Sequence, residues 1–257
     1  MKTKQTNYIH TKTINGHTAY AANLPGNNLS ISIIKPKLFP RIKDPGSAIT
    51  HFIAMIFAIV ATPALLVRAG STHDFVHIFS LSIFILTMIA LYAASTNYHT
   101  FDLSKKKNEL LKKEDHMMIS VMIASSYTPV CLLVVNGHKG IILCTSVWIF
   151  AIAGILIKAF WIYCPKWFSS ILYIAMGWMC VFAFSDIYAT LSIEAFAWLL
   201  GGGIFYTVGG IIYSLKMPGF NKRHPYFGTH EIFHLFVMAG SFCHYILMYQ
   251  YLAVIPN

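Results

Sequence analysis

Seven long apolar stretches constrain this chain more than any other feature of its sequence. A transmembrane helix needs about 20 consecutive, mostly apolar residues to cross the hydrocarbon of a bilayer. The stretches run over residues 49–67, 75–98, 117–135, 141–160, 169–187, 193–215 and 232–254. Hydrophobic residues make up 56% of the chain and charged residues 11%, which excludes an ordinary soluble domain. We therefore predict an all-α integral membrane protein with seven transmembrane helices.

The basic residues favour one side of these spans. Seven Lys and Arg precede the first span, five lie between the second and third, two flank the fourth connection and three flank the sixth. Because successive spans alternate in direction, all of these fall on the side of the amino terminus, whereas only Arg68 and Lys139 fall on the other. Cytoplasmic loops carry the excess of Lys and Arg in membrane proteins. We therefore predict a multi-pass protein of the plasma membrane with a cytoplasmic amino terminus and an external carboxyl terminus.

Two regions of different composition divide the chain. Residues 1–43 are polar and basic, lack an apolar core and predict a partly disordered cytoplasmic tail. Residues 44–257 contain all seven spans and predict a membrane domain. The net charge of +10 could indicate a nucleic-acid ligand, but the basic residues follow membrane topology rather than a stripe on a soluble face. We expect no nucleic-acid partner.

Two histidines stand near the start of the last span with the spacing of one helical turn. His230 and His234 are four residues apart, so their side chains would lie on one face of a helix. Two imidazoles in this arrangement can bind one metal ion, and zinc would require one or two further ligands. The alternative is a pair of histidines at the membrane interface, hydrogen-bonded to backbone or water. Local sequence does not choose between the two.

The direction of the spans brings further polar groups to the same depth. His99 lies at the end of the second span, Asp115 precedes the third, and His51 lies at the start of the first. With alternating spans, all three reach the cytoplasmic side together with His230 and His234. The three imidazoles of His99, His230 and His234 would suit a zinc site with one open position. The Asp115 carboxylate would then orient a bound water molecule.

Each of these candidates also has a simpler explanation. His99 could snorkel from a helix end toward water, and Asp115 could cap the amino end of the third helix. His116 could be the ligand in place of Asp115, although its side chain would point about 100° away around the helix. Ser95, one turn before His99, could contact a ligand, water or substrate, or could donate to the backbone of its own helix.

Several motifs together resemble a known family of membrane proteins. Ser95-x-x-x-His99, Asp115 and the sequence from His224 to His234 are similar to the haemolysin III branch of the progestin and adipoQ receptor family. The last of these reads His-Pro-Tyr-Phe-Gly-Thr-His-Glu-Ile-Phe-His. Two further matching segments are Ser126-Tyr127-Thr128-Pro129 and Gly240-Ser241-Phe242-Cys243-His244-Tyr245. The resemblance covers about residues 44–254.

The resemblance implies a seven-helix membrane fold with a zinc ion near the cytoplasmic side. It implies that His99, His230 and His234 bind the zinc and that Asp115 holds a water molecule on it. The family is distantly similar to alkaline ceramidases, which are zinc amide hydrolases.

The first motif of that family, Glu-x-x-Asn-x-x-x-His, is altered in this chain. It begins at Asp44, has Ser47 in place of the Asn, and ends at His51. The changes keep an acid and a small polar group. We expect Asp44, Ser47 and His51 to support the metal ligands rather than to bind the ion.

These features predict a zinc-dependent hydrolase that acts on the amide or ester bond of a membrane lipid. Zinc would polarise the lipid carbonyl and activate water, while Asp115 would take the proton of that water and pass it to the leaving group, with Ser95 beside it. The alternatives are a non-enzymatic membrane sensor or receptor, and a cytolytic pore, each with a structural zinc ion. A pore should show a polar stripe along its spans, and these spans are mostly apolar. The sequence leaves the lipid and the oligomeric state open.

Overall fold

The computed structural model describes residues 8–14, 17–23, 29–33, 42–72, 74–215, 217–224 and 227–256. Contacts within the chain divide it into two units, Met1–Arg41 and Ile42–Asn257.

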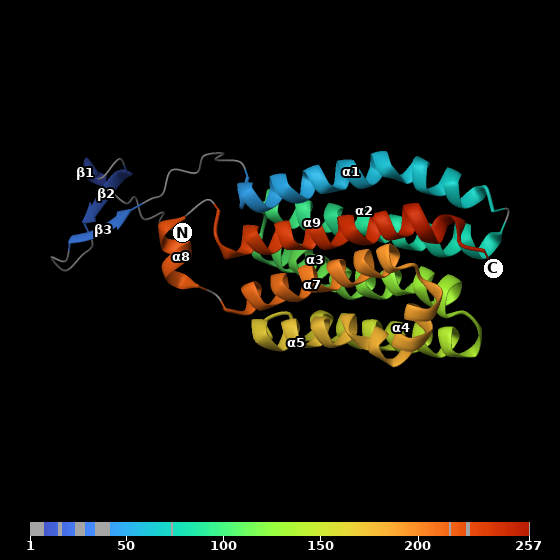
Figure 1. The fold of residues 1–257 in the computed structure, drawn as a ribbon. Helices are drawn as coiled ribbons and strands as arrows, with labels where there is room; N and C mark the ends of the chain where they lie inside the picture. The colour runs from blue at the N-terminus through green and yellow to red at the C-terminus, as the bar shows by residue number, and fades with distance from the viewer. Residues whose placement is uncertain are drawn as a thin grey trace. The chain divides into compact units, whose positions relative to one another are not determined.

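The described part of the second unit is all-helical, and its helices run side by side as a bundle (Figure 1). The helices are α1 (Pro45–Gly70), α2 (Phe75–Thr100), α3 (Lys105–Pro129), α4 (Gly137–Phe160), α5 (Lys166–Gly177), α6 (Phe184–Thr190), α7 (Ile193–Leu215), α8 (Pro218–Arg223) and α9 (Thr229–Ile246). Short 3-10 and π turns extend some of them: η1 (Val130–Val135), η2 (Met179–Ala183), η3 (Leu247–Tyr251) and η4 (Leu252–Val254). Among the described residues, seven segments are long and apolar enough to cross a membrane, and they coincide with the seven predicted spans.

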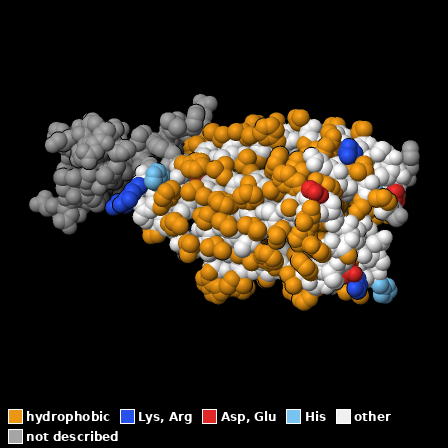
Figure 2. All heavy atoms as spheres, in the orientation of Figure 1, with side chains coloured by type: hydrophobic (Ala, Val, Ile, Leu, Met, Phe, Trp, Pro, Cys, Tyr) orange, Lys and Arg blue, Asp and Glu red, His pale blue; other side chains and the backbone are white. Residues whose placement is uncertain are grey.

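The outer surface of the bundle is mostly apolar, as expected for a protein that contacts lipid. Large apolar side chains such as Phe57, Phe160 and Phe182 are 69%, 86% and 85% exposed. Figure 2 shows hydrophobic side chains covering most of the visible bundle, with the few charged side chains near its ends. A soluble protein rarely exposes so large a continuous apolar surface, because exposure to water costs about 25 cal/mol per Å². Lipid contact removes this cost.

Packing between helices far apart in sequence creates the interior of the bundle. α2 packs between α1 and α3, and α9 packs against both α1 and α7. α1 and α9 begin at the same end of the bundle, and the carboxyl terminus lies at the opposite end (Figure 1). The end of α2 and the starts of α1 and α9 therefore lie close together.

The third helix begins well before its apolar part. α3 starts at Lys105, whereas the apolar run begins at Met117. Lys, Asn, Glu and Leu fill the added turns, and most of these residue types favour a helix in water as well as in lipid. Asp115 is consequently an interior residue of α3 and does not cap its amino end, as one explanation from the sequence had it.

Polar side chains satisfy the backbone where helices break. The Tyr127 hydroxyl donates to the Gly177 carbonyl at 2.6 Å and accepts from the Cys180 backbone N–H at 2.9 Å. These bonds lie where α5 gives way to η2. Inside a bilayer no water could replace them, so Tyr127 holds the break in place.

The first unit contains a three-stranded antiparallel sheet in the order β1-β2-β3. Its strands are β1 (Tyr8–Ile14), β2 (His17–Asn23) and β3 (Leu29–Ile33). These strands were not expected from the sequence and lie outside the all-helical membrane domain; the partial disorder expected for residues 1–43 stays a prediction. Two signals in the sequence account for the sheet: apolar and polar residues alternate in β3, and Asn-Gly separates β1 from β2, as is typical of tight hairpins. The rest of residues 1–41 lies outside the described residues.

Candidate metal centre

Three histidines from two helices converge at one end of the bundle. His99 lies in the last turn of α2, and His230 and His234 lie in the first two turns of α9. One ligand atom from each lies within 4.8 Å of those of the other two. His99 is 2% exposed, so it does not snorkel toward water. The structure thus brings together the three imidazoles that the sequence singled out.

The closest pair of nitrogens has the separation that one metal ion would require. His99 Nε2 and His230 Nε2 are 3.2 Å apart. Two nitrogens at about 2.0–2.1 Å from a tetrahedral zinc ion lie about 3.3 Å from each other. The donor set and this distance fit zinc, and imidazole also suits copper, iron and nickel.

Two side chains of the α1 segment fix the orientation of the imidazoles. Asp44 Oδ2 lies 3.1 Å from His99 Nδ1, and Thr50 Oγ1 lies 3.3 Å from His234 Nδ1. A partner on one ring nitrogen sets the tautomer and turns the other nitrogen toward the metal position. Asp44 therefore contacts a candidate ligand, and its supporting role stays a prediction. Thr50 was not among the predicted site residues. The only signal for it in the sequence was its position directly before His51.

The carboxyl of Asp44 is half-exposed just outside the membrane-spanning part of α1. Partial burial alone would raise its pKa, but the hydrogen bond to His99 and the positive charges of neighbouring groups outweigh that effect and lower the pKa below its usual value. Asp44 is consequently an anion in any ordinary buffer. Its backbone N–H also donates to the His99 carbonyl at 2.8 Å, which ties the start of α1 to the end of α2.

Ser47 positions α9 rather than an imidazole. Its hydroxyl donates to Glu231 Oε1 at 2.7 Å, and Glu231 Oε2 accepts from the Gly228 backbone N–H at 2.8 Å. Asn221 Oδ1 accepts from the Thr229 N–H at 2.8 Å. Free N–H groups at a helix start need such partners. Glu231 was not among the predicted site residues, although an acidic residue in the first turn of a helix is a known capping signal.

His51 packs directly on the cluster. Its ring stacks on that of His234, with centroids 3.6 Å apart and planes 8° apart, and meets Tyr92 edge-on at 5.0 Å. Neither ring nitrogen has a hydrogen-bond partner among the described residues. His51 lies outside the group of three converging imidazoles, so its place is beside a candidate ligand.

Asp115 and Ser95 are both buried and share a cavity wall with His230 and His234. Asp115 Oδ2 lies 3.1 Å from His116 Nδ1, and neither residue belongs to the converging group. The Ser95 hydroxyl lies beside the Asp115 carboxylate and makes no hydrogen bond to the backbone, whereas the adjacent Thr96 donates to the Tyr92 carbonyl at 2.7 Å. Ser95 therefore does not bond to its own helix and remains available in the cavity.

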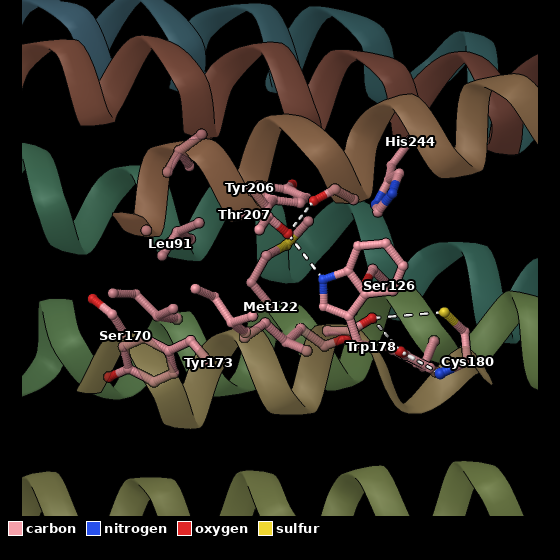
Figure 3. Close-up of a pocket in the computed structure, with 18 of the residues that line it drawn as sticks. Leu91, Met122, Ser126, Ser170, Tyr173, Trp178, Cys180, Tyr206, Thr207 and His244 are labelled. Carbon is pink, nitrogen blue, oxygen red and sulfur yellow. Dashed lines mark hydrogen bonds between the residues drawn. The ribbon is translucent and has the colours of Figure 1, made fainter. Parts of the chain in front are cut away.

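The cavity runs through the bundle from the histidines toward the opposite end. Its volume is about 210 Å³, and α1, α2, α3, α5, α7 and α9 all contribute to its wall. Figure 3 shows part of this wall, with Ser170 and Tyr173 toward one end and Trp178 and His244 toward the other. Beyond the polar end the lining is mostly apolar. An acyl chain would fit this lining, with its polar group beside the histidines.

The fold and this centre define a class: a seven-helix membrane protein with a candidate metal site at the end of an apolar cavity. A model of the Haemolysin-III related family matches residues 39–245. The chain is 34% identical over 219 residues to the Hemolysin-3 homolog of Bacillus subtilis (strain 168), which covers 85% of this chain and 99% of that protein. It is 33% identical to Hemolysin-3 of Bacillus cereus over 77% of this chain and 87% of that protein.

A more distant match extends the relationship to receptors. The chain is 30% identical to the ADIPOR-like receptor IZH2 of Saccharomyces cerevisiae over 79 residues, which are 30% of this chain and 24% of that protein. The protein therefore belongs to the haemolysin III branch of the progestin and adipoQ receptor family, as its motifs predicted.

Proposed function

We propose that this protein is a zinc-dependent hydrolase that cleaves the amide or ester bond of a membrane lipid. One observation carries the proposal: His230, His234, the buried carboxylate of Asp115 and the hydroxyl of Ser95 line the polar end of one apolar cavity, where His99 converges with the two histidines. A substrate with an acyl chain would fill the apolar part and place its carbonyl at the polar end.

The ligand set supports a reactive rather than a purely structural site. A structural zinc site is usually closed by four protein ligands, whereas catalytic sites keep a position open. Only three ligand atoms converge among the described residues, and Asp115 stands outside them. When bound, zinc would act as a Lewis acid toward the lipid carbonyl and would lower the pKa of water to about 7.

The chain's own residues would bind the substrate and move protons. Asp44 and Thr50 hold His99 and His234 in fixed tautomers. The buried carboxylate of Asp115 accepts the proton of the attacking water and returns it to the leaving nitrogen or oxygen. Ser95, which lies beside Asp115 and lines the cavity, donates a hydrogen bond to substrate or water. The apolar wall excludes other water from the reaction.

A non-enzymatic sensor with a structural metal is the alternative, and the name of the yeast relative is that of a receptor. The names of the Bacillus relatives instead suggest cytolysis. The mostly apolar lining of the cavity argues against a water-filled pore. The apolar lining is equally compatible with a lipid substrate of a hydrolase and with a lipid ligand of a sensor.

Turnover and zinc content measured on matched variants separate these functions. Asp115→Asn should keep bound zinc and lose most release of fatty acid from ceramide or phospholipid, because proton transfer typically contributes 10²–10⁴-fold. His234→Ala should lose both zinc and activity. Glu114→Gln removes an exposed acid next to Asp115 and serves as the control. Zinc-loaded protein that binds lipid but releases no fatty acid from any lipid class would identify a sensor.

We further propose that the histidine end faces the cytoplasm in the plasma membrane. Lys105, Lys106, Lys107, Lys112 and Lys113 all lie in the first turns of α3, which begin at this end. Such clusters mark cytoplasmic loops. A single cysteine introduced near Lys106 should react with an impermeant thiol reagent only after cells are opened. Labelling of intact cells would reverse the orientation.

A further inference from the structure

A second polar cluster lies at the same end of the bundle, on a different wall of the cavity. Lys158, near the end of α4, is 2% exposed. Its ammonium donates to Ser169 Oγ at 2.5 Å and to Cys164 Sγ at 3.0 Å. Ser169 and Ser170 lie in the first half of α5, are 2% and 5% exposed, and line the cavity.

The charge of Lys158 lacks a protein counter-ion among the described residues. Its hydrogen-bond partners are a hydroxyl and a thiol, and no described carboxylate lies within 4.0 Å of its ammonium. Lys112 adds a second positive charge nearby. Burying a cation is costly unless it is paired, and the partial negative charge at the end of α4 offsets only a small part of that cost. The arrangement favours an anion that enters from the cavity.

The hydroxyl of Ser169 stands between this charge and the cavity, and the hydroxyl of the next residue, Ser170, also lines the cavity. The oxygen of Ser169 accepts a hydrogen bond from Lys158 and lies 3.3 Å from Cys164 Sγ, so its own hydrogen can turn to that weak acceptor or to a stronger one in the cavity. The buried hydroxyl of Ser170 has no hydrogen-bond partner among the described residues, yet it lines the cavity. A buried hydroxyl without a partner is rare and indicates a missing ligand or water. Figure 3 shows Ser170 next to Tyr173 on this wall.

We propose that Lys158, Ser169 and Ser170 form a phosphate-binding subsite for the headgroup of a lipid whose acyl chain occupies the cavity. Two hydroxyl donors backed by a buried ammonium match the several acceptor oxygens of a phosphate. The amino-terminal half of α5, whose dipole favours negative charge, carries both serines. Lys158 acts through Ser169, because it does not itself line the cavity.

This inference names the substrate class of the proposed hydrolase and rests on its lipid-binding cavity. The imidazoles belong to α2 and α9, whereas the phosphate subsite belongs to α4 and α5. A substrate would therefore be held at two points, with its carbonyl at the histidines and its phosphate at the serines. Neutral lipids would lose the second point of attachment.

A binding measurement without turnover tests the subsite. The full chain in nanodiscs, with zinc and after chelation, is titrated with 1-oleoyl lysophosphatidate and with 1-monooleoylglycerol, which differ only in the phosphate. Wild type should bind the phosphate lipid at least about tenfold more tightly, the factor expected for one charge-assisted hydrogen bond. Lys158→Met should abolish this preference. Lys113→Met, which removes a partly exposed cation paired with Glu109, should keep it.

Ser170→Ala decides the question if Lys158→Met does not fold, because the Ser170 hydroxyl holds no part of the protein together. It should reduce the preference severalfold. Competition by inorganic phosphate as strong as by the lipid would assign the site to free phosphate, whereas weak competition assigns it to the headgroup. Equal binding of both lipids by wild type would overturn the subsite. His234→Ala should lose hydrolysis and keep the preference, so the two proposals can fail separately.

Discussion

Removal of the Asp44 carboxylate offers a direct test of the metal centre, since the rest of its surroundings should survive. The side chain makes no capping hydrogen bond to α1, so Asp44→Ala leaves the start of that helix intact. The backbone hydrogen bond from residue 44 to the His99 carbonyl is also independent of the side chain. What disappears is the 3.1 Å contact with His99 Nδ1 and a 3.9 Å ion pair with the partly exposed Lys43.

The expected loss of zinc affinity can be bounded from the geometry. Loss of a partner that orients a metal-binding histidine typically costs 10–100-fold in affinity. The Asp44 side chain is 44% exposed, so solvent screens its charge and the lower end applies. We expect Asp44→Ala to weaken zinc binding about tenfold, or about 1.4 kcal/mol. Asp44→Asn keeps an acceptor oxygen and should lose about threefold, because only the charge is removed.

Competition with a zinc-binding dye in detergent would measure these affinities, with Glu114→Gln as the control for an exposed acid at the same end. The pH dependence carries a second check. The pKa of Asp44 is lowered, so its contribution is present above the ordinary Asp range and disappears only as the pH falls through that lowered value. The ratio of wild-type to Asp44→Ala affinity should therefore be equal at about pH 6 and about pH 8. Affinity of Asp44→Ala within twofold of wild type would refute the orienting role.

Two further predictions concern the stability of the bundle. Tyr127→Phe should lower the free energy of unfolding by about 1–3 kcal/mol, because it removes the bonds to Gly177 and Cys180 at a helix break where water cannot replace them. A thermal melt in detergent measures this loss, with Tyr188→Phe, at an exposed tyrosine, as the control. A melting temperature of Tyr127→Phe no lower than that of the control would contradict the prediction. Gly202→Ala should cost about 1–3 kcal/mol, because a Cβ there overlaps the His244 ring. A Cβ added at Gly201 or Gly203 meets nothing within 4 Å, so Gly201→Ala and Gly203→Ala should melt like wild type. If these two variants lose as much stability as Gly202→Ala, the close approach of α7 and α9 is not the cause of the loss.

The first unit contains a sheet that its composition did not indicate. Residues 1–43 are polar and basic, which favoured partial disorder over structure. The structure places β1, β2 and β3 in an antiparallel sheet. Alternation of apolar and polar residues in Leu29–Ile33 was the better guide, because a strand depends on the period of the pattern rather than on its mean hydropathy.

The sequence by itself determined the seven spans and the end of the bundle at which His99, His230 and His234 would be found. Hydrophobic length is a local property, and alternation of direction follows from it, so neither needs knowledge of side-chain contacts. Only the tertiary structure decided that Thr50 supports His234, that Asp115 lies inside α3, and that Lys158 stands behind Ser169. Those pairings depend on how helices rotate about their axes and pack, and packing of residues far apart in sequence leaves no local pattern to read.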